Sequence, residues 1–394
     1  MESTNYFRNF EYSVLDFKLG KYIVCNTGLI QWMSKKFFLF AFINSLLLSL
    51  GYYIIFSNVI LKSSARQLQW IKSKNSILAT KTIFTETPRE QRTFVCNEVF
   101  KITLEENLKV IQNYPIGNAK MYLKRLGVNN LEPNQLRSFP VFVTAFDSTY
   151  FNESEGLFKS LHENFLDNSK YKKDVHIVAY DMGLTTLEAL MVKRSCQCEL
   201  RKFQFEYLPL HVRALTTYAF KPIIVQEVLM EFGFVWWVDT SIRFTTNNID
   251  LQIAYTKAKG ILYTVSRNSL MKGSLTKNTL NATFNYFQED HCKFRPFHAV
   301  WATTLLFHFD RVTRAVVKAW VICALNKPCI APTGSEYKRG CSLKENYDGR
   351  CHRFDQSAFG IIIRRLFHDQ DYPVDKNLTL IYTIKRNDYV QYFK

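Results

Sequence analysis

A stretch of 25 residues from Phe37 to Leu61, FFLFAFINSLLLSLGYYIIFSNVIL, contains no charged side chain. A helix rises about 1.5 Å per residue, so about 20 such residues cross the hydrocarbon core of a bilayer. Backbone groups in lipid must be satisfied within the segment, which restricts it to a helix. The stretch is too long for a cleavable signal peptide, and 36 residues precede it. We therefore expect a transmembrane signal anchor at residues 37–61, with a buried core helix as the alternative.

The orientation of this anchor follows from features other than flanking charge. Lysines and arginines lie on both sides of the segment, so the positive-inside rule does not decide. Eight of the nine cysteines follow it, and so do three N-x-S/T sequons, at Asn152, Asn281 and Asn377. An even cysteine number suits disulfides in an oxidising compartment. We expect a single-pass type II membrane protein with a cytosolic tail (1–36), a body in the Golgi or endoplasmic reticulum lumen, and glycans on these asparagines.

The chain is basic, with a formal net charge of +17. Its lysines and arginines are dispersed, without a run of five or six like charges. This pattern favours a generally basic surface, which suits anionic substrates, and we expect no nucleic-acid partner.

The cysteines after residue 61 are interpreted as structural. Cys341 and Cys351 bracket a polar loop and are predicted to form a disulfide, and Cys323 and Cys329 to pair likewise. Cys196 and Cys198 are too close for an easy mutual bond, which predicts distant partners for them, with Cys96 and Cys292 as the remaining thiols. Without a C-x-x-C pair, zinc is not expected.

Residues 62–138 are polar and poor in strand-like runs, and we expect a stem and a small N-terminal subdomain with one or two short helices over 104–126. From residue 139 apolar runs alternate with helical spacings. We expect strands at 141–146, 174–181, 198–205, 234–244 and 261–265, and helices at 153–165, 185–194, 218–232, 313–325 and 355–367. Such alternation predicts an α/β domain over 139–394, a Rossmann-type, mostly parallel sheet with flanking helices.

Polar residues follow the expected strands at their carboxyl ends, where ligands of parallel sheets bind. Thr144 and Asp147 end the first strand, and Asp239 and Ser241 follow the apolar run in VWWVDTS. A buried strand that delivers Asp239 to the rim is a rigid mount for a metal ligand or an acceptor of sugar hydroxyl groups.

This VWWVDTS segment resembles the D-x-D region of GT-A-type glycosyltransferases, in which strand-end acids hold a divalent cation on a nucleotide diphosphate. The resemblance implies Mn²⁺ or Mg²⁺, hard cations that take carboxylate and phosphate oxygens. Here the pattern is D-x-S, and Ser241 is a weaker ligand than a second carboxylate. His352 is a candidate further ligand, since some such families use a late histidine.

Two further segments carry the resemblance. HVRALTTYAFKPIIVQE resembles the part that precedes the D-x-D strand; it makes Arg213 and Lys221 candidates to meet a diphosphate and Tyr218 a candidate to contact the donor. RCHRFDQ places Asp355 at a helix start, where it either caps the helix or, as in the acceptor-side element of several such enzymes, serves as a base or acceptor ligand.

The stretch from about 139 to 382 resembles a nematode-rich domain family of unknown function that is thought to be glycosyltransferase-like. The resemblance is carried by VTAFDSTYFNES, IVAYDMGL, HVRALTTYAFKPIIVQE and WWVDTSIRF. It implies a glycosyltransferase that moves a sugar from a nucleotide-sugar donor to a glycan or protein acceptor. The alternative is a non-catalytic lumenal carbohydrate-binding or interaction protein that kept the fold and lost the second metal carboxylate.

Overall fold

The computed structural model describes residues 96–167, 170–265, 273–342, 344–368 and 381–394. The expected tail, membrane anchor and first part of the stem, and the sequon at Asn377, lie outside these residues. Within the described chain no single helix is long and apolar enough to cross a bilayer, and one bent pair, Arg311–Leu325 with Lys327–Tyr337, passes that test only by length and composition. Residues from Thr93 to Lys394 form one compact unit.

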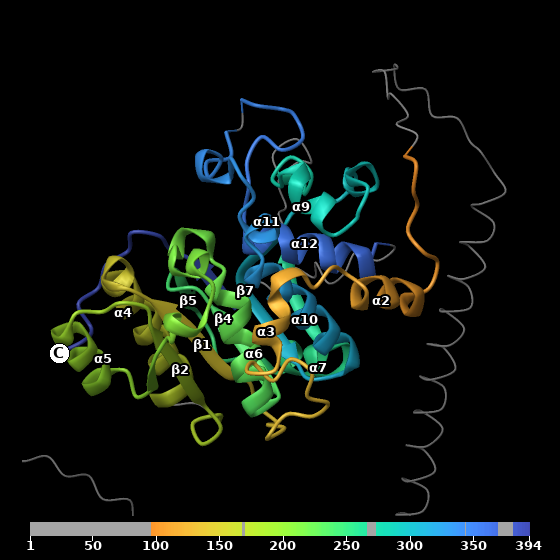
Figure 1. The fold of residues 1–394 in the computed structure, drawn as a ribbon. Helices are drawn as coiled ribbons and strands as arrows, with labels where there is room; N and C mark the ends of the chain where they lie inside the picture. Colours follow the sequence, from red (N-terminus) through yellow and green to blue (C-terminus); the bar gives the residue numbers. More distant parts are fainter. Residues whose placement is uncertain (1–95, 168–169, 266–272, 343, 369–380) are drawn as a thin grey trace, which may run out of the picture. The chain divides into compact units, whose positions relative to one another are not determined.

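A six-stranded sheet forms the centre of this unit (Figure 1). Its order is β3 (Glu199–Lys202), β2 (His176–Asp181), β1 (Val141–Phe146), β4 (Phe234–Val238), β7 (Val300–His308) and β6 (Ile261–Val265). Pairs β3–β2, β2–β1 and β1–β4 are parallel, whereas β7 runs antiparallel to both of its neighbours. The predicted α/β fold with a mostly parallel sheet is confirmed.

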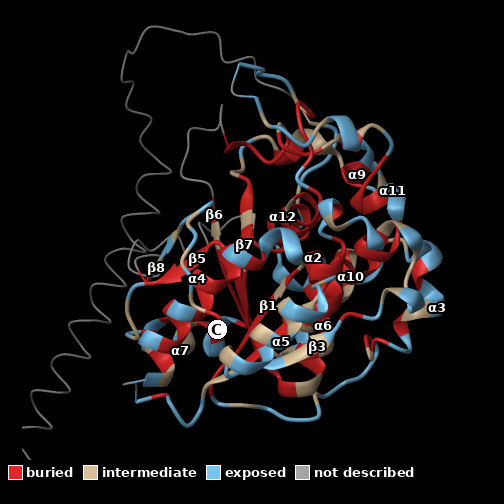
Figure 2. Cartoon of the chain, turned by 90° about the vertical axis from the view of Figure 1, so that its left-hand side faces the viewer, coloured by how far each residue is buried: buried red, intermediate tan, exposed pale blue. Residues whose placement is uncertain are grey.

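Side chains alternate between two hydrophobic clusters, one on each face of the sheet. Val141, Val143 and Trp237 belong to one cluster, and Phe142 and Trp236 to the other. The first face is covered by α6 (Phe220–Phe232), α10 (Arg311–Leu325) and α12 (Asp355–Leu366), and the second by α4 (Phe151–Leu161) and α5 (Thr186–Ser195). Figure 2 shows these strands buried at the centre, with exposed residues on the outer sides of the helices.

Most predicted elements form near their predicted bounds, because their apolar spacing matches the face that each one buries. The helix after β1 continues past Leu161 as a π-helical turn, His162–Asp167. Thr185 caps α5 with Glu188 in a capping box, and Gly233 ends α6 at a φ of +68°. The remaining helices are α2 (Leu104–Gln112), α3 (Lys120–Leu123), α7 (Asp250–Lys259), α9 (Asn281–Tyr286) and α11 (Lys327–Ile330).

The predicted single strand over 234–244 is wrong in one respect: it breaks in two. The chain leaves the sheet after Val238, turns through a hydrogen bond from the Ile242 amide to the Asp239 carbonyl, and resumes as β5 (Ile242–Phe244) in a second sheet. There β5 pairs antiparallel with β8 (Tyr382–Ile384). The break leaves Asp239 and Ser241 in the turn that follows β4, at the carboxyl-end rim of the main sheet.

Residues 96–138, expected as part of a stem and subdomain, pack onto the same unit. Leu108 and Ile111 of α2 lie in the core cluster with α10 and α12. The amides of Asn134 and Gln135 donate to the carbonyls at the end of α6.

Four disulfides connect the described cysteines. The predicted pairs Cys341–Cys351 and Cys323–Cys329 are confirmed. The prediction of distant partners for Cys196 and Cys198 is wrong, because these two residues bond to each other and Cys96 bonds to Cys292. Gln197 between them adopts a φ of +45°, and this left-handed turn brings the two Cα atoms to 5.0 Å.

Candidate functional site

A buried lysine joins two aspartates at the carboxyl end of β4. The ammonium of Lys221, on the first turn of α6, lies 3.0 Å from Oδ1 of Asp239 and 3.2 Å from Oδ2 of Asp355. It also donates to the carbonyl of Ala302 at 2.9 Å. The Lys221 side chain is 4% exposed, that of Asp355 5% and that of Asp239 29%. Asp239 is therefore the member of this triad that solvent and ligands reach.

Electrostatics keep the lysine charged and perturb its buried partner. Burial lowers the pKa of Lys221, but the carboxylates of Asp239 and Asp355 outweigh it and the net pKa is raised. Burial raises the pKa of Asp355, and although Lys221 acts in the opposite direction, the net pKa stays above its ordinary value. Among the described residues, Oδ2 of Asp355 accepts no hydrogen bond of good geometry, although it contacts Lys221. A buried carboxylate with spare acceptor capacity is a candidate proton acceptor.

Two hollows adjoin this triad. The first, here called the sheet-edge chamber, has a volume of about 230 Å³; its walls include Asp147, Tyr150, Phe220, Trp237 and Ser241. The second, here called the arginine chamber, has a volume of about 210 Å³; its walls include Arg339, His352, Arg353, Asp355 and Gln356. The two chambers share the lining residues Thr216, Tyr218, Lys221, Asp239 and Arg386. Two molecules bound in them would therefore meet at Asp239.

Strained backbone occurs on the walls of both chambers. Tyr218 has a φ of +53°, and Phe354, the residue before Asp355, has a φ of +47°. Such conformations cost on the order of 1–3 kcal/mol in a residue with a side chain, and they cluster at functional sites. No side-chain hydrogen bond caps α12 at Phe354, so Asp355 is the first helical residue and not the cap. The predicted cap role of Asp355 is therefore wrong, and its role as a base or acceptor ligand stays a prediction.

The C-terminal segment supplies Arg386 to both chambers. The amide of Lys385 donates to the Ser241 carbonyl at 2.8 Å, and that of Asn387 to Oε2 of Glu153 at 3.2 Å. Arg243 holds the next residue through a hydrogen bond to the Asp388 carbonyl at 3.0 Å. Arg386 is thus fixed between anchored neighbours while its own side chain stays exposed.

The predicted donor residues divide into those that line a chamber and those that do not. Asp147, Tyr218 and Ser241 line the sheet-edge chamber, with Asp147 also accepting from the Thr149 amide at 3.1 Å. Thr144 is buried in β1 and Arg213 is exposed beside η5 (Leu210–Arg213), and neither lines a chamber. Lys221 lines both chambers and contacts Asp239, Asp355 and the Ala302 carbonyl, and its predicted contact with a diphosphate stays a prediction.

The predicted cation does not fit these residues. The Lys221 ammonium already lies between Asp239 and Asp355, so a divalent ion bound between these carboxylates would meet a full positive charge. Both ring nitrogens of His352 are engaged, Nδ1 by the Leu280 amide at 3.4 Å and Nε2 by the Ile330 carbonyl at 3.0 Å. Burial lowers the pKa of His352 to about 4. In the described part of the chain no group of three or more His, Cys, Asp or Glu side chains is placed to hold a metal ion.

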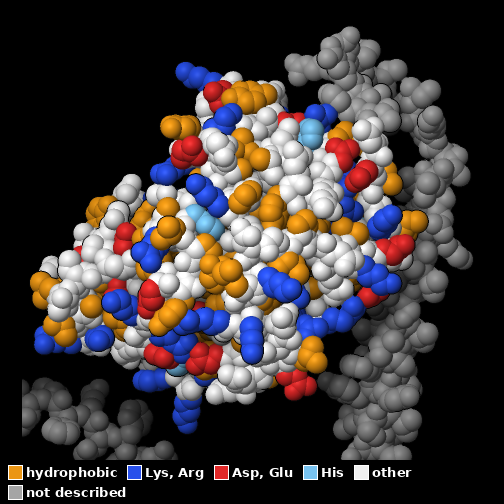
Figure 3. All heavy atoms as spheres, viewed as in Figure 1, with side chains coloured by type: hydrophobic (Ala, Val, Ile, Leu, Met, Phe, Trp, Pro, Cys, Tyr) orange, Lys and Arg blue, Asp and Glu red, His pale blue; other side chains and the backbone are white. Residues whose placement is uncertain are grey.

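Sequence reasoning missed three arginines, Arg339, Arg353 and Arg386, and the aromatic wall at Tyr150 and Trp237. Arg353 lies two residues before Asp355 in RCHRFDQ, and this closeness to a candidate site residue is the one sequence signal that could have indicated it. Figure 3 shows basic side chains scattered over one face among acidic and hydrophobic ones, so charge density alone does not mark the site.

One family model matches part of the sequence. Residues 93–226 match a family model described as "Protein of unknown function (DUF1647)". The predicted resemblance to a domain family of unknown function is confirmed over this part. No curated protein matches the sequence.

Solved structures that match at low similarity include glycosyltransferases. They include the bifunctional glycosyltransferase WbbM in its apo form (TM-score 0.36, 12% identity, covering 60% of this chain and 38% of that chain). Mouse xyloside xylosyltransferase 1 matches with a TM-score of 0.32 and 12% identity, over 58% of this chain and 84% of that chain. The mannosyltransferase Ktr4p from S. cerevisiae matches with a TM-score of 0.30 and 10% identity, over 56% of this chain and 77% of that chain.

Proposed function

We propose that this protein is a glycosyltransferase that moves a sugar from a nucleotide-sugar donor to a hydroxyl group of a glycan or glycoprotein acceptor. The observation that carries the proposal is the position of Asp239 and Asp355. Both carboxylates contact Lys221, and Asp239 lies on the wall that two adjoining chambers share. Group transfer between two bound molecules requires two neighbouring subsites with polar groups at their junction.

The sheet-edge chamber suits the donor. It lies at the carboxyl ends of parallel strands, where ligands of such sheets bind. Tyr150 and Trp237 offer aromatic surface for a base or a sugar face. Oδ1 of Asp239 is occupied by Lys221 and by the indole N–H of Trp237 at 2.8 Å, which fixes the carboxylate and leaves its other oxygen for a sugar hydroxyl. Arg386, reachable from both chambers, would neutralise the diphosphate with its forked donors.

The transfer step assigns Asp355 as the proton acceptor. The acceptor oxygen bonds to the anomeric carbon of the donor sugar, and the bond from that carbon to the diphosphate oxygen breaks. The bonding electron pair leaves with the nucleoside diphosphate, and the hydroxyl proton passes to Asp355. A carboxylate with a raised pKa is a stronger base, and such proton transfer typically contributes about 10²–10⁴-fold in rate. Lys221 holds the two carboxylates in place, and no step requires a metal ion.

The compartment belongs to the same proposal. The expected signal anchor would leave residues 62–394 in the lumen of the Golgi or endoplasmic reticulum. Four disulfides in the described chain support an oxidising compartment. Asn152 and Asn281 are exposed, so both sequons are accessible for glycosylation.

The test is a donor screen on the full-length chain, purified in detergent, that measures release of nucleoside diphosphate from a panel of nucleotide sugars with Mn²⁺ and with a chelator. Asp239→Asn keeps the shape and removes the charge. We expect it to lower turnover by about 10²–10³-fold, the usual effect of losing one preorganised interaction. Asp174→Asn, at an exposed carboxylate outside both chambers, is the matched control.

The rival function, a non-catalytic carbohydrate-binding protein, predicts a different result. The parent would then show a thermal shift with a sugar ligand but would release no nucleoside diphosphate from any donor. Asp239→Asn would change that shift alone. A folded parent that neither binds nor turns over any nucleotide sugar would refute the proposed transferase.

A further inference from the structure

Three arginines line the arginine chamber and carry no acidic partner. Arg339, Arg353 and Arg386 are exposed, and none forms an ion pair with a described acid. Five other arginines, in contrast, pair with carboxylates: Arg201, Arg243, Arg295, Arg311 and Arg365. Among the described residues that line this chamber, the acids are Asp239 and Asp355, and Lys221 contacts both. Three guanidinium groups without a described acidic partner therefore line a hollow of about 210 Å³, a lining that suits an anionic ligand.

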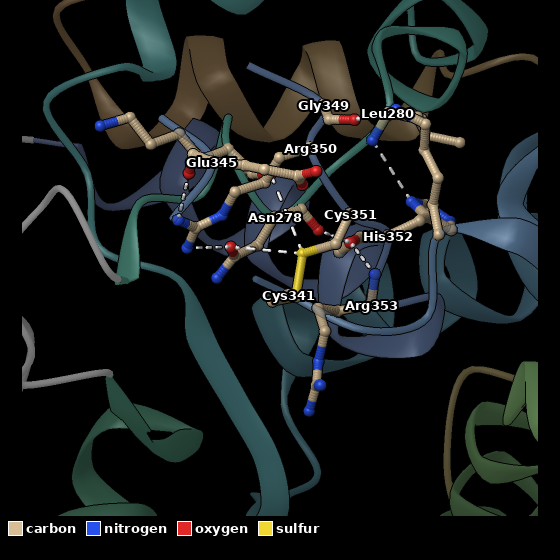
Figure 4. Close-up of a disulfide and its surroundings, with 12 residues drawn as sticks. Asn278, Leu280, Cys341, Glu345, Gly349, Arg350, Cys351, His352 and Arg353 are labelled. Atoms are coloured by element: carbon tan, nitrogen blue, oxygen red, sulfur yellow. Dashed lines mark hydrogen bonds between the residues drawn. A yellow bond between two sulfur atoms is a disulfide. The ribbon is translucent and has the colours of Figure 1, made fainter. Parts of the chain in front are cut away.

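The backbone that carries two of these arginines is braced. The Cys341–Cys351 disulfide joins the segment after Arg339 to the segment before Arg353. The His352 amide donates to the Lys338 carbonyl at 2.8 Å, and the Arg353 amide donates to Oγ of Ser357 at 3.1 Å. Figure 4 shows this disulfide, with the side chain of Arg353 extending away from it. A fixed backbone limits the positions that the Arg339 and Arg353 side chains can reach, which keeps both guanidinium groups near the chamber.

The division of the arginines between the chambers separates their roles. Arg386 lines both chambers and is assigned above to the diphosphate, whereas Arg339 and Arg353 line the arginine chamber alone. Amide and hydroxyl groups bind a neutral sugar hydroxyl equally well. A neutral sugar therefore does not explain why the guanidinium groups of Arg339 and Arg353 line this chamber without a described acidic partner. We propose that Arg339 and Arg353 bind an anionic group of the acceptor glycan, a uronic-acid carboxylate or a sulfate ester. This inference rests on the proposed function, because it places the acceptor in the arginine chamber beside Asp355.

The test measures glycan binding apart from turnover. The full-length chain in detergent is titrated calorimetrically, with and without a nucleoside diphosphate, with three oligosaccharides that differ only in the terminal sugar: glucuronic acid, sulfated glucose or unmodified glucose. We expect one anionic glycan to bind about 10-fold or more tightly than the neutral one. A preference between the two anionic glycans identifies the source of the charge. Arg339→Gln and Arg353→Gln should each weaken that binding by about 10-fold, the usual effect of losing one charge-assisted hydrogen bond.

Controls separate the site from general charge and folding. Arg194→Gln, at an exposed arginine on α5 outside both chambers, should leave the affinity for all three glycans unchanged. Unchanged unfolding temperatures verify that each variant folds. Equal affinity for all three glycans, no glycan binding at all, or an equal loss in Arg194→Gln overturns the anionic acceptor. If the chain turns over a donor but binds all three glycans equally, the proposed transferase stands and this inference is wrong. If the chain binds the anionic glycan more tightly but turns over no donor, the anionic site stands and the proposed transferase is wrong.

Discussion

The substitution Lys221→Met tests the triad on which the site depends. Methionine keeps much of the length and apolar stem of the lysine but removes its ammonium. Asp239, which is 29% exposed, and the Ala302 carbonyl then each lose a hydrogen-bond donor, and Asp355, which is 5% exposed, loses its contact with the ammonium. Removing one partner of a buried ion pair typically costs about 3–5 kcal/mol, because the remaining charge stays buried without compensation. For a unit of this size, about 2 °C per kcal/mol converts this loss into a fall in Tm of about 6–10 °C.

The pH dependence gives the same test a second readout. Lys221 acts to lower the pKa of Asp355, so its loss raises that pKa further above the unfolded value. A carboxyl whose folded pKa is raised contributes stability at low pH, and this contribution disappears as the pH rises through the folded pKa. The stability deficit of Lys221→Met should therefore shrink as the pH falls from 7 towards 5.

The assay is chemical and thermal unfolding of parent and variant at several pH values. Lys318→Met is the control, because this partly exposed lysine donates to Oδ1 of Asn129 and contacts no described carboxylate, and its loss should change stability by less than about 0.5 kcal/mol. Adding Asp355→Asn to Lys221→Met should recover part of the loss, since the uncompensated charge is gone. A deficit below about 1 kcal/mol, or one that does not vary with pH, would refute the reasoning.

Three further predictions follow from the same structure. Replacing Cys341 and Cys351 together by serine should lower the free energy of unfolding by about 2–3 kcal/mol through the freed loop, and non-reducing peptide mapping of the parent should recover the two as one linked species. Burial lowers the pKa of His352 to about 4, so acid protonates this histidine more readily in the unfolded chain than in the folded one. Lowering the pH from 7 to 5 should therefore reduce the free energy of unfolding of the parent by about 2 kcal/mol more than that of His352→Gln, which unfolding experiments at both pH values would measure. Glycans on Asn152, Asn281 or Asn377 should slow the chain on an electrophoresis gel when it is expressed with microsomes, and endoglycosidase should remove this shift. A chain that shows no shift and is cut by protease from the cytosolic side would contradict the lumenal orientation.

The sequence was informative where one local pattern fixes a structural outcome. Apolar runs with β-branched residues predict β1 and β6 at their observed bounds, since a strand between two helical layers is apolar on both faces. The same logic placed Asp239 on the rim of the sheet, because four apolar residues lead directly to this carboxylate. The loop between Cys341 and Cys351 is short and polar, so its closure was also predictable.

Local patterns were misleading where the backbone leaves its ordinary conformations. The Cys196–Cys198 bond depends on the left-handed conformation of Gln197, and a glutamine in the sequence does not predict a positive φ. The division of 234–244 into β4 and β5 depends on pairing with β8, which lies near the other end of the domain. Strand pairing between distant segments leaves little trace in either segment alone.

What the sequence by itself determined is the class of fold and the rim position of Asp239, because burial periodicity and strand length are local properties of the chain. What only the tertiary structure decided is the chemistry of the site. Lys221 has the residue type of a diphosphate ligand, and the packing of α6 against β4 brings its ammonium between Asp239 and Asp355, a contact that the sequence did not predict. Arg339, Arg353 and Arg386 reach the chambers from a braced loop and a C-terminal segment. Electrostatic roles are set by which charges lie within a few ångströms of each other, and that distance is a property of the folded chain alone.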